Sequence, residues 1–278
     1  MKKLLLSFSV AICLLQSAEA QQLRTPAPSP SSNIKQEFAL SNVEVAYSRP
    51  AVRGRKIFGD LVPFGKVWRT GANNATTITF GEDVTVGDKP VPAGKYGLLT
   101  IPGQGEWTII ISKQLDVTSP AAYKQDQDVA RINVKTAQVP FTVENFIIVF
   151  DDVTATSMNL EMLWENTSVS FPIKANIDQK IMGQIDNLMN KDNRPYFQAA
   201  MYYMENNKDL NKAVTWLDKA IEQNPNAFWV YHQKANALAK LGKKQDAITT
   251  ANKSIELAKA AQNDDYVALN QKLIASLK

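Results

Sequence analysis

The segment that spans residues 47–80 concentrates side chains able to bind an anion or a sugar. Its four arginines present planar guanidinium groups, which match the geometry of carboxylate, phosphate and sulfate. A tryptophan next to the last arginine could stack on a flat or sugar-like ligand, and amide and hydroxyl side chains follow it closely. We therefore predict an anion or glycan site formed by these residues: Arg49, Arg53, Arg55, Trp68, Arg69, Asn73, Asn74 and Thr76.

A purely structural role for the same segment stays open. Arginine in a β-sandwich often pairs with an acid, and Asp60 and Asp83 are candidates for such pairs. Trp68 could belong to the core, and the glycines could serve only the turns. Under this alternative the segment shapes part of a domain that acts as a spacer.

The sequence offers few residues for catalysis or metal binding. His232 is its only histidine and Cys13 its only cysteine, which argues against a zinc or copper site and against a nucleophilic triad in the first half of the chain. Neither a phosphate-binding loop nor a dinucleotide fingerprint is present. We expect no cofactor and no metal. The alternative is a hydrolase that uses Asp or Glu carboxylates on envelope glycans or esters.

The first 20 residues have the features of a secretory signal peptide. Lys2 and Lys3 precede an apolar run of about 12 residues, which is too short to span a bilayer. Ala18 and Ala20 form an A-x-A cleavage site, and we expect cleavage after Ala20. The prediction is therefore a periplasmic or secreted protein, with an uncleaved anchor as the alternative.

Residues 21–35 follow the predicted cleavage site and are rich in Pro, Ser and Thr. This composition predicts a disordered leader. The formal net charge of the chain is +4, which is too small to indicate a nucleic-acid partner. No later apolar run is long enough to cross a membrane, so we expect no transmembrane segment once the signal peptide is removed.

Residues 36–174 show the period-two alternation that is typical of β-strands. Val43, for example, begins a run in which apolar side chains alternate with polar or small ones. A glycine-rich turn at residues 103–105 would join strands at 95–101 and 106–112 into a hairpin. Many short strands, with turns between them and no helical stretch, predict an antiparallel β-sandwich.

Three stretches of this region carry a resemblance to a known family. They read SRPAVRGRKIFGDLVPFGKVWRTGANNATTITF, VPAGKYGLLTIPG and EWTIIIS. They are similar to the secreted bacterial family called domain of unknown function 2911, over about residues 36–174. The resemblance implies a β-sandwich in an exported protein, often joined to helical repeats, and it transfers no catalytic residue.

Residues 176–278 change to helical periodicity. Apolar residues between Ile177 and Met189 predict a helix that bridges the two domains. Farther on, similar residues recur 34 positions apart, as Phe197 and Tyr231 do, which is the tetratricopeptide period. We predict two repeats and a capping helix, at about residues 194–227, 228–261 and 263–277.

The repeats resemble the tetratricopeptide family with two departures. Lys208 stands where the turn glycine is expected in the first copy, and Lys234 occupies an apolar position of the second. Two repeats are fewer than the three or so that are needed for stability. We therefore expect the capping helix to cover one end, and the helix over residues 176–190 or the β domain to cover the other.

Members of that family commonly bind peptides on a concave face formed by the first helix of each repeat. The resemblance places these residues on that face: Gln198, Tyr202, Glu205, Asn206, Trp229, His232, Asn236 and Lys240. This aromatic and hydrogen-bonding strip suits a peptide or protein partner. The alternative is that this strip is an ordinary amphipathic face packed against the neighbouring domain. We interpret His232 as a groove or surface residue, not as a catalyst.

The sequence thus predicts a multidomain chain, β then α, in which an antiparallel β-sandwich precedes a tetratricopeptide-like helical repeat array. We expect an exported, non-enzymatic binding protein. Its sandwich would take an anionic or glycan ligand, and its helices would dock a protein or a peptide.

Overall fold

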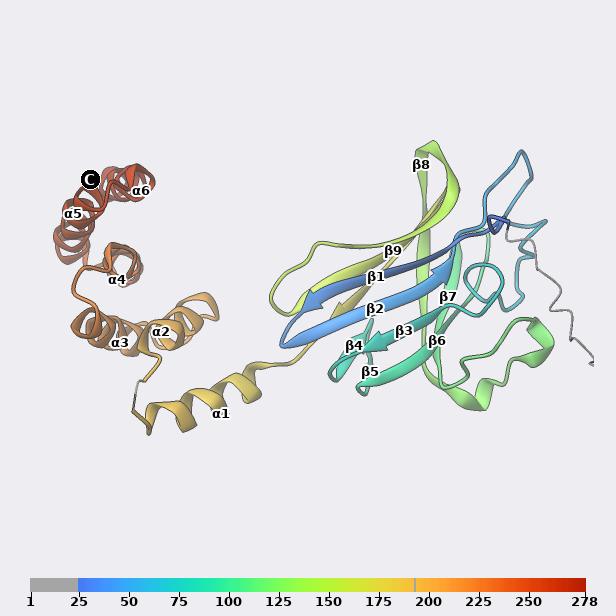
Figure 1. The fold of residues 1–278 in the computed structure, drawn as a ribbon, viewed down its shortest axis with the longest axis horizontal. Helices are drawn as coiled ribbons and strands as arrows, with labels where there is room; N and C mark the ends of the chain where they lie inside the picture. The colour runs from blue at the N-terminus through green and yellow to red at the C-terminus, as the bar shows by residue number, and fades with distance from the viewer. Residues whose placement is uncertain (1–24, 193) are drawn as a thin grey trace, which may run out of the picture. The chain divides into compact units, whose positions relative to one another are not determined.

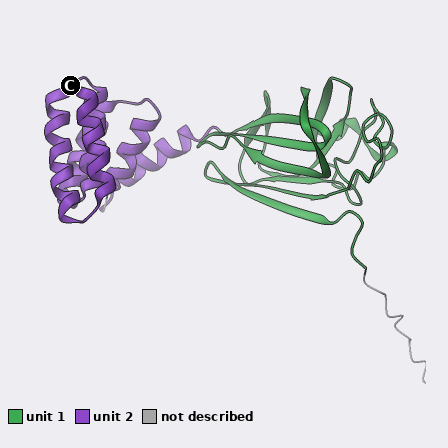
Figure 2. Cartoon of the chain, turned by 90° about the horizontal axis from the view of Figure 1, so that it is seen from above, with its two compact units in different colours: residues 1–175 green, residues 176–278 purple. Residues whose placement is uncertain are grey.

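The computed structural model describes residues 25–192 and 194–278, which fall into two compact units (Figure 2). The first unit ends at Ala175, and the second runs from Asn176 to Lys278. The predicted signal peptide and the beginning of the predicted leader lie outside the described residues. Within the described ranges, no helix has both the length and the apolar character that a membrane crossing requires.

The first unit is an antiparallel β structure, as the sequence predicts (Figure 1). In the described part of the chain, nine strands are hydrogen-bonded in the order β1-β2-β3-β6-β7-β8-β9-β4-β5. The strands are β1 (Ser31–Phe38), β2 (Ser41–Ser48), β3 (Thr77–Phe80), β4 (Val84–Val86), β5 (Lys89–Val91), β6 (Gly94–Ile101), β7 (Glu106–Ser112), β8 (Asp128–Asp151) and β9 (Ser157–Lys174). The expected hairpin is the β6–β7 pair, in which Leu99 lies opposite Ile110.

β8 joins the two layers of this unit, of which one contains β1, β2, β3, β6 and β7 and the other contains β9, β4 and β5. Its first part, residues 128–135, pairs with β7, and its second part, residues 136–151, pairs with β9. The pairing of β8 with β9 changes register twice between Gln138 and Ile147. Bulges of this kind bend a strand, which lets one strand belong to both layers. The prediction of short strands missed this continuity, because the bend interrupts the alternation of buried and exposed residues.

The core lies between the two layers. Phe58 contacts Trp107 of β7 and Trp164 of β9, with ring centroids 4.8 Å and 6.0 Å apart. All three side chains are buried. Complete burial of a large apolar side chain contributes about 1.5–3 kcal/mol, so this aromatic cluster is a main source of stability for the unit.

The sheet begins earlier than the predicted domain boundary. β1 pairs with β2 along its whole length, from Ser31 opposite Ser48 to Phe38 opposite Ser41. Residues 31–35, which the composition assigned to a disordered leader, therefore belong to an edge strand. Their half-buried and exposed side chains alternate as in other strands, and the neighbouring prolines and serines obscured this pattern in the sequence.

The second unit is helical (Figure 1). Its helices among the described residues are α1 (Asp178–Met189), α2 (Tyr196–Glu205), α3 (Leu210–Gln223), α4 (Phe228–Lys240), α5 (Lys244–Ala260) and α6 (Asp264–Leu277). Helices α2 and α3 pack as one pair, and α4 and α5 as the next. α1 contributes Ile185 to the hydrophobic cluster of the first pair, where it is buried together with Ala199 and Met204 of α2.

The two lysines that depart from the repeat pattern both form ion pairs. Lys208 lies 2.6 Å from the carboxylate of Asp178 on α1, and Lys234 lies 2.6 Å from the carboxylate of Asp218 on α3. Lys208 therefore ties α1 to the end of α2. Lys234 replaces an apolar contact between helices by a charged one.

Candidate functional site

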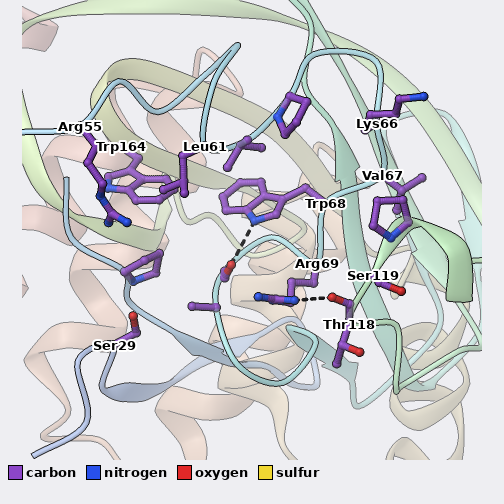
Figure 3. A pocket seen from close by; sticks show the side chains of 16 residues that line it. Ser29, Arg55, Leu61, Lys66, Val67, Trp68, Arg69, Thr118, Ser119 and Trp164 are labelled. Carbon is purple, nitrogen blue, oxygen red and sulfur yellow. Dashed lines mark hydrogen bonds between the residues drawn. The ribbon is translucent and has the colours of Figure 1, made fainter. Parts of the chain in front are cut away.

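A cavity opens in the β unit beside the segment that is rich in arginine (Figure 3). Its volume is about 370 Å³, near the lower end of the roughly 300–1,000 Å³ that small-molecule sites occupy. Its walls come from the segment between β2 and β3, from the loop between β7 and β8, and from β9. The lining residues are Ser29, Pro50, Arg55, Leu61, Val62, Pro63, Lys66, Val67, Trp68, Arg69, Gly71, Ala72, Thr118, Ser119, Pro120 and Trp164.

Backbone pairing fixes Trp68 in the cavity wall. The amide of Trp68 donates to the carbonyl of Thr100 in β6 at 2.7 Å, and the amide of Thr100 donates back at 3.0 Å. The indole Nε1–H of Trp68 donates to the carbonyl of Gly71 at 3.0 Å. A side chain at Gly71 would be crowded, because its Cβ would lie 3.0 Å from the carbonyl oxygen of Ser48. Trp68 is thus held by an isolated bridge to the sheet.

The wall around Trp68 is aromatic. Trp164 stacks on Trp68 with ring centroids 5.8 Å apart and ring planes 16° from parallel. Phe146 and Trp107 pack edge-on against Trp68 at 5.2 Å and 6.1 Å. The indole Nε1–H of Trp164 donates to the carbonyl of Glu144 at 3.3 Å. Because both indole donors at this wall bind protein carbonyls, the two tryptophans offer a ligand only carbon surface.

Three cationic side chains line the cavity, and none of the described lining residues is an acid. Figure 3 shows Arg55 and Lys66 at opposite ends of the cavity, with Arg69 between them. None of the three takes part in an ion pair within the described ranges. The cavity therefore carries positive charge without a counter-ion from the protein, which favours an anionic ligand.

Backbone carbonyls, not carboxylates, accept the hydrogen bonds of these arginines. Arg55 donates through Nε to the carbonyl of Val52 at 3.0 Å and through Nη2 to that of Ala51 at 2.6 Å. Arg69 donates through Nη1 to the carbonyl of Thr118. A carbonyl satisfies a donor but leaves the positive charge in place. The alternative in which acids neutralise the segment therefore does not apply to these two side chains.

Arg69 keeps one edge of its guanidinium unused. Its Nε is buried and has no hydrogen-bond partner among the described residues. Nε and Nη2 form this edge, whereas Nη1, on the other side of the group, binds Thr118. A buried donor without a partner destabilises the protein by about 1–3 kcal/mol. Because Nε is out of reach of solvent, the donor of this edge that a ligand can contact is Nη2.

Five of the eight residues predicted for this site lie outside the cavity, and two of them are arginines. Arg49 donates through Nε to the carbonyl of Phe146 at 3.1 Å. Arg53 donates through Nη2 to the carbonyl of Pro28 at 3.0 Å. Both side chains tie the segment to neighbouring backbone and do not face the cavity.

The remaining three predicted residues also lie outside the cavity. Asn73 donates to the carbonyl of Ser29 at 3.1 Å, and Thr76 is fully buried and donates to the carbonyl of Thr70 at 2.6 Å. Asn74 lines a separate and more open hollow. Of the predicted set, the cavity brings together only Arg55, Trp68 and Arg69. Elsewhere in the described residues, no group of three His, Cys, Asp or Glu side chains is placed to hold a metal ion.

Several lining residues come from distant parts of the chain and were not predicted. Trp164 comes from β9, Thr118 and Ser119 from the loop between β7 and β8, and Ser29 from the residues before β1. No local pattern marks these positions, because their role depends on how the strands pair. Lys66, by contrast, lies inside the arginine-rich segment, two residues before Trp68. Its charge could have indicated from the sequence that it belongs to an anion site.

The strip predicted for the helical unit is exposed over part of its length. Trp229 keeps 37% of its surface exposed. The exposed members are Gln198, Glu205, Asn206, Trp229 and Lys240, and the half-buried members are Tyr202 and Asn236. Part of this face is therefore open to a partner, and part of it serves the packing of the unit.

Tyr202 uses its hydroxyl to hold α1. The hydroxyl donates to the carboxylate of Asp178 at 2.7 Å. Burial, followed by this hydrogen bond, raises the pKa of Tyr202 to about 12. The pKa of Asp178 is lowered, first by the hydrogen bond from Lys208 and then by the one from Tyr202. The hydroxyl of Tyr202 is thus engaged within the unit.

His232 is a buried residue, and its interpretation as a groove or surface residue was wrong. Its side chain is covered by α6, and the residue is 8% exposed. Nδ1 lies 2.9 Å from Oδ1 of Asn270 on α6, and Nε2 lies 3.1 Å from Nδ2 of Asn236. Asn270 also donates to Oγ of Ser254 on α5 at 2.9 Å. The repeat pattern could not show this network, because it does not describe how a capping helix packs.

The β unit defines the family to which the chain belongs. The family described as "Protein of unknown function (DUF2911)" matches residues 29–173, more than half of the chain, and the chain belongs to that family. Two descriptions of the tetratricopeptide repeat match residues 194–227 and 216–249. These repeats support a protein-interaction role for the helical unit.

The search of curated proteins finds no match. Among solved structures, the tetratricopeptide repeat domain protein from Salinibacter ruber is similar to part of this chain. The identity is 17%, the similarity covers 30% of this chain and 91% of that chain, and the TM-score is 0.28.

Proposed function

We propose that this protein is a non-enzymatic binding protein whose β unit takes a small anionic or sugar-like ligand in the cavity beside Trp68. The observation that carries this proposal is the charge of the cavity. Arg55, Lys66 and Arg69 line it without an acid partner, around a wall of aromatic carbon. Such a combination of a few charged groups with an apolar wall is typical of small-molecule sites.

The alternative of a carboxylate-based hydrolase finds no support at this cavity. Such an enzyme needs two carboxyl groups that face one another across a cleft, about 5–10 Å apart. The cavity lining contains neither Asp nor Glu in the ranges that the structure describes. The residues that are present can hold and orient an anion, which is a binding function.

A thermal-shift screen of the mature protein, residues 21–278, tests the cavity proposal. The probes are sulfate, inorganic phosphate, and neutral and acidic monosaccharides. At least one anionic probe should raise the melting temperature, because a ligand that binds only the folded state stabilises it. The shift should shrink at high salt, since charge attraction is screened. Equal melting temperatures with every probe, up to concentrations where weak binding becomes visible, would sink the proposal.

For the helical unit we propose a protein or peptide partner that binds around the exposed part of the predicted strip. Trp229 supports this proposal, because large exposed aromatic side chains often anchor partner proteins. Peptides selected from a display library against the whole protein provide the probe. Their binding should be lost in Trp229→Ala and kept in Leu269→Ala, which removes another exposed apolar side chain. Equal losses in both variants would contradict this location.

We also propose that the protein is exported after cleavage behind Ala20. The two lysines, the short apolar run and the A-x-A site support this proposal. N-terminal sequencing of the protein from the envelope fraction or the medium should find Gln21 first. A cytoplasmic protein that retains Met1 would contradict it.

A further inference from the structure

We propose that the ligand of the cavity is an acidic sugar, a pyranose ring that carries a carboxylate, and that Arg69 binds that carboxylate. This inference rests on the proposed binding function of the β unit and narrows it to one chemical class. Three features of the cavity support it: its carbon wall, its free hydroxyl groups and the unused edge of one guanidinium.

The carbon wall suits the apolar face of a sugar ring. Trp68 presents ring carbon to the cavity, because its Nε1–H is bound to the carbonyl of Gly71. Leu61 and Pro63 extend this apolar surface. One face of a pyranose consists of C–H groups, which pack on an aromatic ring much as a flat apolar group does. A ligand made only of charge, such as sulfate, would leave this surface without a contact.

The hydroxyl groups of the lining suit the hydroxyl groups of a sugar. Ser29, Thr118 and Ser119 all line the cavity. Within the described residues, none of their side-chain hydroxyls forms a hydrogen bond to the protein. Each hydroxyl can both donate and accept, as the ring hydroxyls of a sugar can. An aromatic acid would match the carbon wall and the positive charge, but it would leave these three groups without partners.

The anion of the ligand belongs on Arg69. The edge formed by Nε and Nη2 is the part of this side chain that the protein leaves without a partner among the described residues. Because Nε is buried, a carboxylate in the cavity accepts a charge-assisted hydrogen bond from Nη2. Its single negative charge balances the single charge of Arg69. A phosphate dianion would need a second cation close by, whereas Figure 3 shows Arg55 and Lys66 at the two ends of the cavity.

The test compares D-glucuronate with probes that each lack one of its features. Calorimetric titration of the mature protein should show binding of glucuronate and much weaker binding of glucose, benzoate and glucose 6-phosphate. Glucose keeps the ring without the charge, benzoate keeps the charge and a flat face without hydroxyls, and glucose 6-phosphate exchanges the carboxylate for a phosphate.

Arg69→Gln should weaken the binding of glucuronate by about tenfold or more, because a charge-assisted hydrogen bond is lost. Arg53→Gln is the matched control, since Arg53 lies outside the cavity and should leave the affinity unchanged. Ser119→Ala is a second variant, at an exposed loop position where a substitution should not affect folding. It should lower the affinity for glucuronate several-fold.

The outcomes separate this inference from the proposed function on which it rests. Equal affinities for glucose and glucuronate would overturn the role of the carboxylate, and equal affinities for benzoate and glucuronate would overturn the sugar. Tighter binding of glucose 6-phosphate would replace the carboxylate by a phosphate and would leave an anion site in place. Absence of binding for all probes in both this titration and the wider anion screen would overturn the inference and the proposed function together.

Discussion

The indole rings of Trp68 and Trp164 stack with their centroids 5.8 Å apart and their planes 16° from parallel. Trp164 belongs to β9 and is almost completely buried, whereas Trp68 comes from the irregular segment after β2 and is half-buried. A side chain from a long connection thus completes the core between the layers. The same ring also lines the cavity, so the core role and the binding role considered for Trp68 do not exclude one another.

Trp164→Ala should lower the free energy of unfolding of the β unit by about 3–5 kcal/mol, because it empties a fully packed site. Trp68→Phe should lower it clearly less, since a ring remains in place beside Trp164. Scanning calorimetry can follow both variants. If Trp164→Ala unfolded at the same temperature as the wild type, the role of Trp164 in the core would be contradicted.

Arg69→Met should leave the ligand-free protein about as stable as the wild type, within about 1 kcal/mol. The variant loses one charge-assisted hydrogen bond to Thr118, worth about 1.5–3 kcal/mol, but it also removes a buried donor that lacks a partner, which costs about 1–3 kcal/mol. Urea unfolding without ligand measures this difference.

Arg55→Met is the matched control for that experiment. Arg55 lines the same cavity, but its Nε and Nη2 both have carbonyl partners. Its replacement should therefore lower the stability slightly, whereas that of Arg69 should not. A loss of more than about 2 kcal/mol in Arg69→Met would show that the bond to Thr118 outweighs the unsatisfied Nε.

The sequence was sufficient to predict the order of the domains and the antiparallel character of the first one. The alternation around Val43 is a local signal, and it corresponds to β2 in the structure. The 34-residue recurrence is a periodic signal, and it corresponds to the paired helices. The continuity of β8 across two layers could not be predicted. Its bend breaks the alternation, and only pairing with β7 and β9 makes the strand visible.

The candidate site was only partly predictable for a related reason. Residue types in one segment pointed to Arg55, Trp68 and Arg69, but the same types at Arg49 and Arg53 bind backbone elsewhere. A sequence shows which side chains could bind an anion, and the pairing of distant strands decides which of them meet. His232 failed as a groove residue because the packing of α6 is likewise a non-local event.

Asn270→Ala should destabilise the helical unit by about 2–3 kcal/mol. Asn270 is fully buried and links His232 of α4 to Ser254 of α5, so its removal leaves two buried polar side chains without this partner. Gln271→Ala, at the exposed neighbouring position of α6, is the control and should change little. Thermal unfolding followed by helical circular dichroism compares them. Equal melting temperatures for the two variants would show that the network does not hold α6 in place.

Because of the pair formed by Tyr202 and Asp178, the attachment of α1 should weaken as the pH rises into the alkaline range. The folded-state pKa of Tyr202 is about 12, above its ordinary value of 10.0, because burial and the bond to Asp178 both disfavour the phenolate. A group whose pKa is raised on folding stabilises the protein fully below its unfolded pKa and loses that contribution as the pH rises through its folded pKa. The contribution of Tyr202 should therefore be complete below about pH 10 and disappear between about pH 10 and pH 12.

Asp178→Asn tests the cause of that shift. It removes the hydrogen-bonded carboxylate but leaves the burial of Tyr202, so the pKa of Tyr202 should fall only part of the way from about 12 towards 10.0. The measurement is the phenolate absorbance during an alkaline titration. The titration of Tyr202→Phe is subtracted from that of the wild type, and the titration of the double variant Asp178→Asn/Tyr202→Phe is subtracted from that of Asp178→Asn. This subtraction removes the other tyrosines, including Tyr123, whose pKa is also raised to about 12 by burial and by its hydrogen bond to Asp128. An unchanged pKa in Asp178→Asn would mean that α1 is not attached to α2 through this pair.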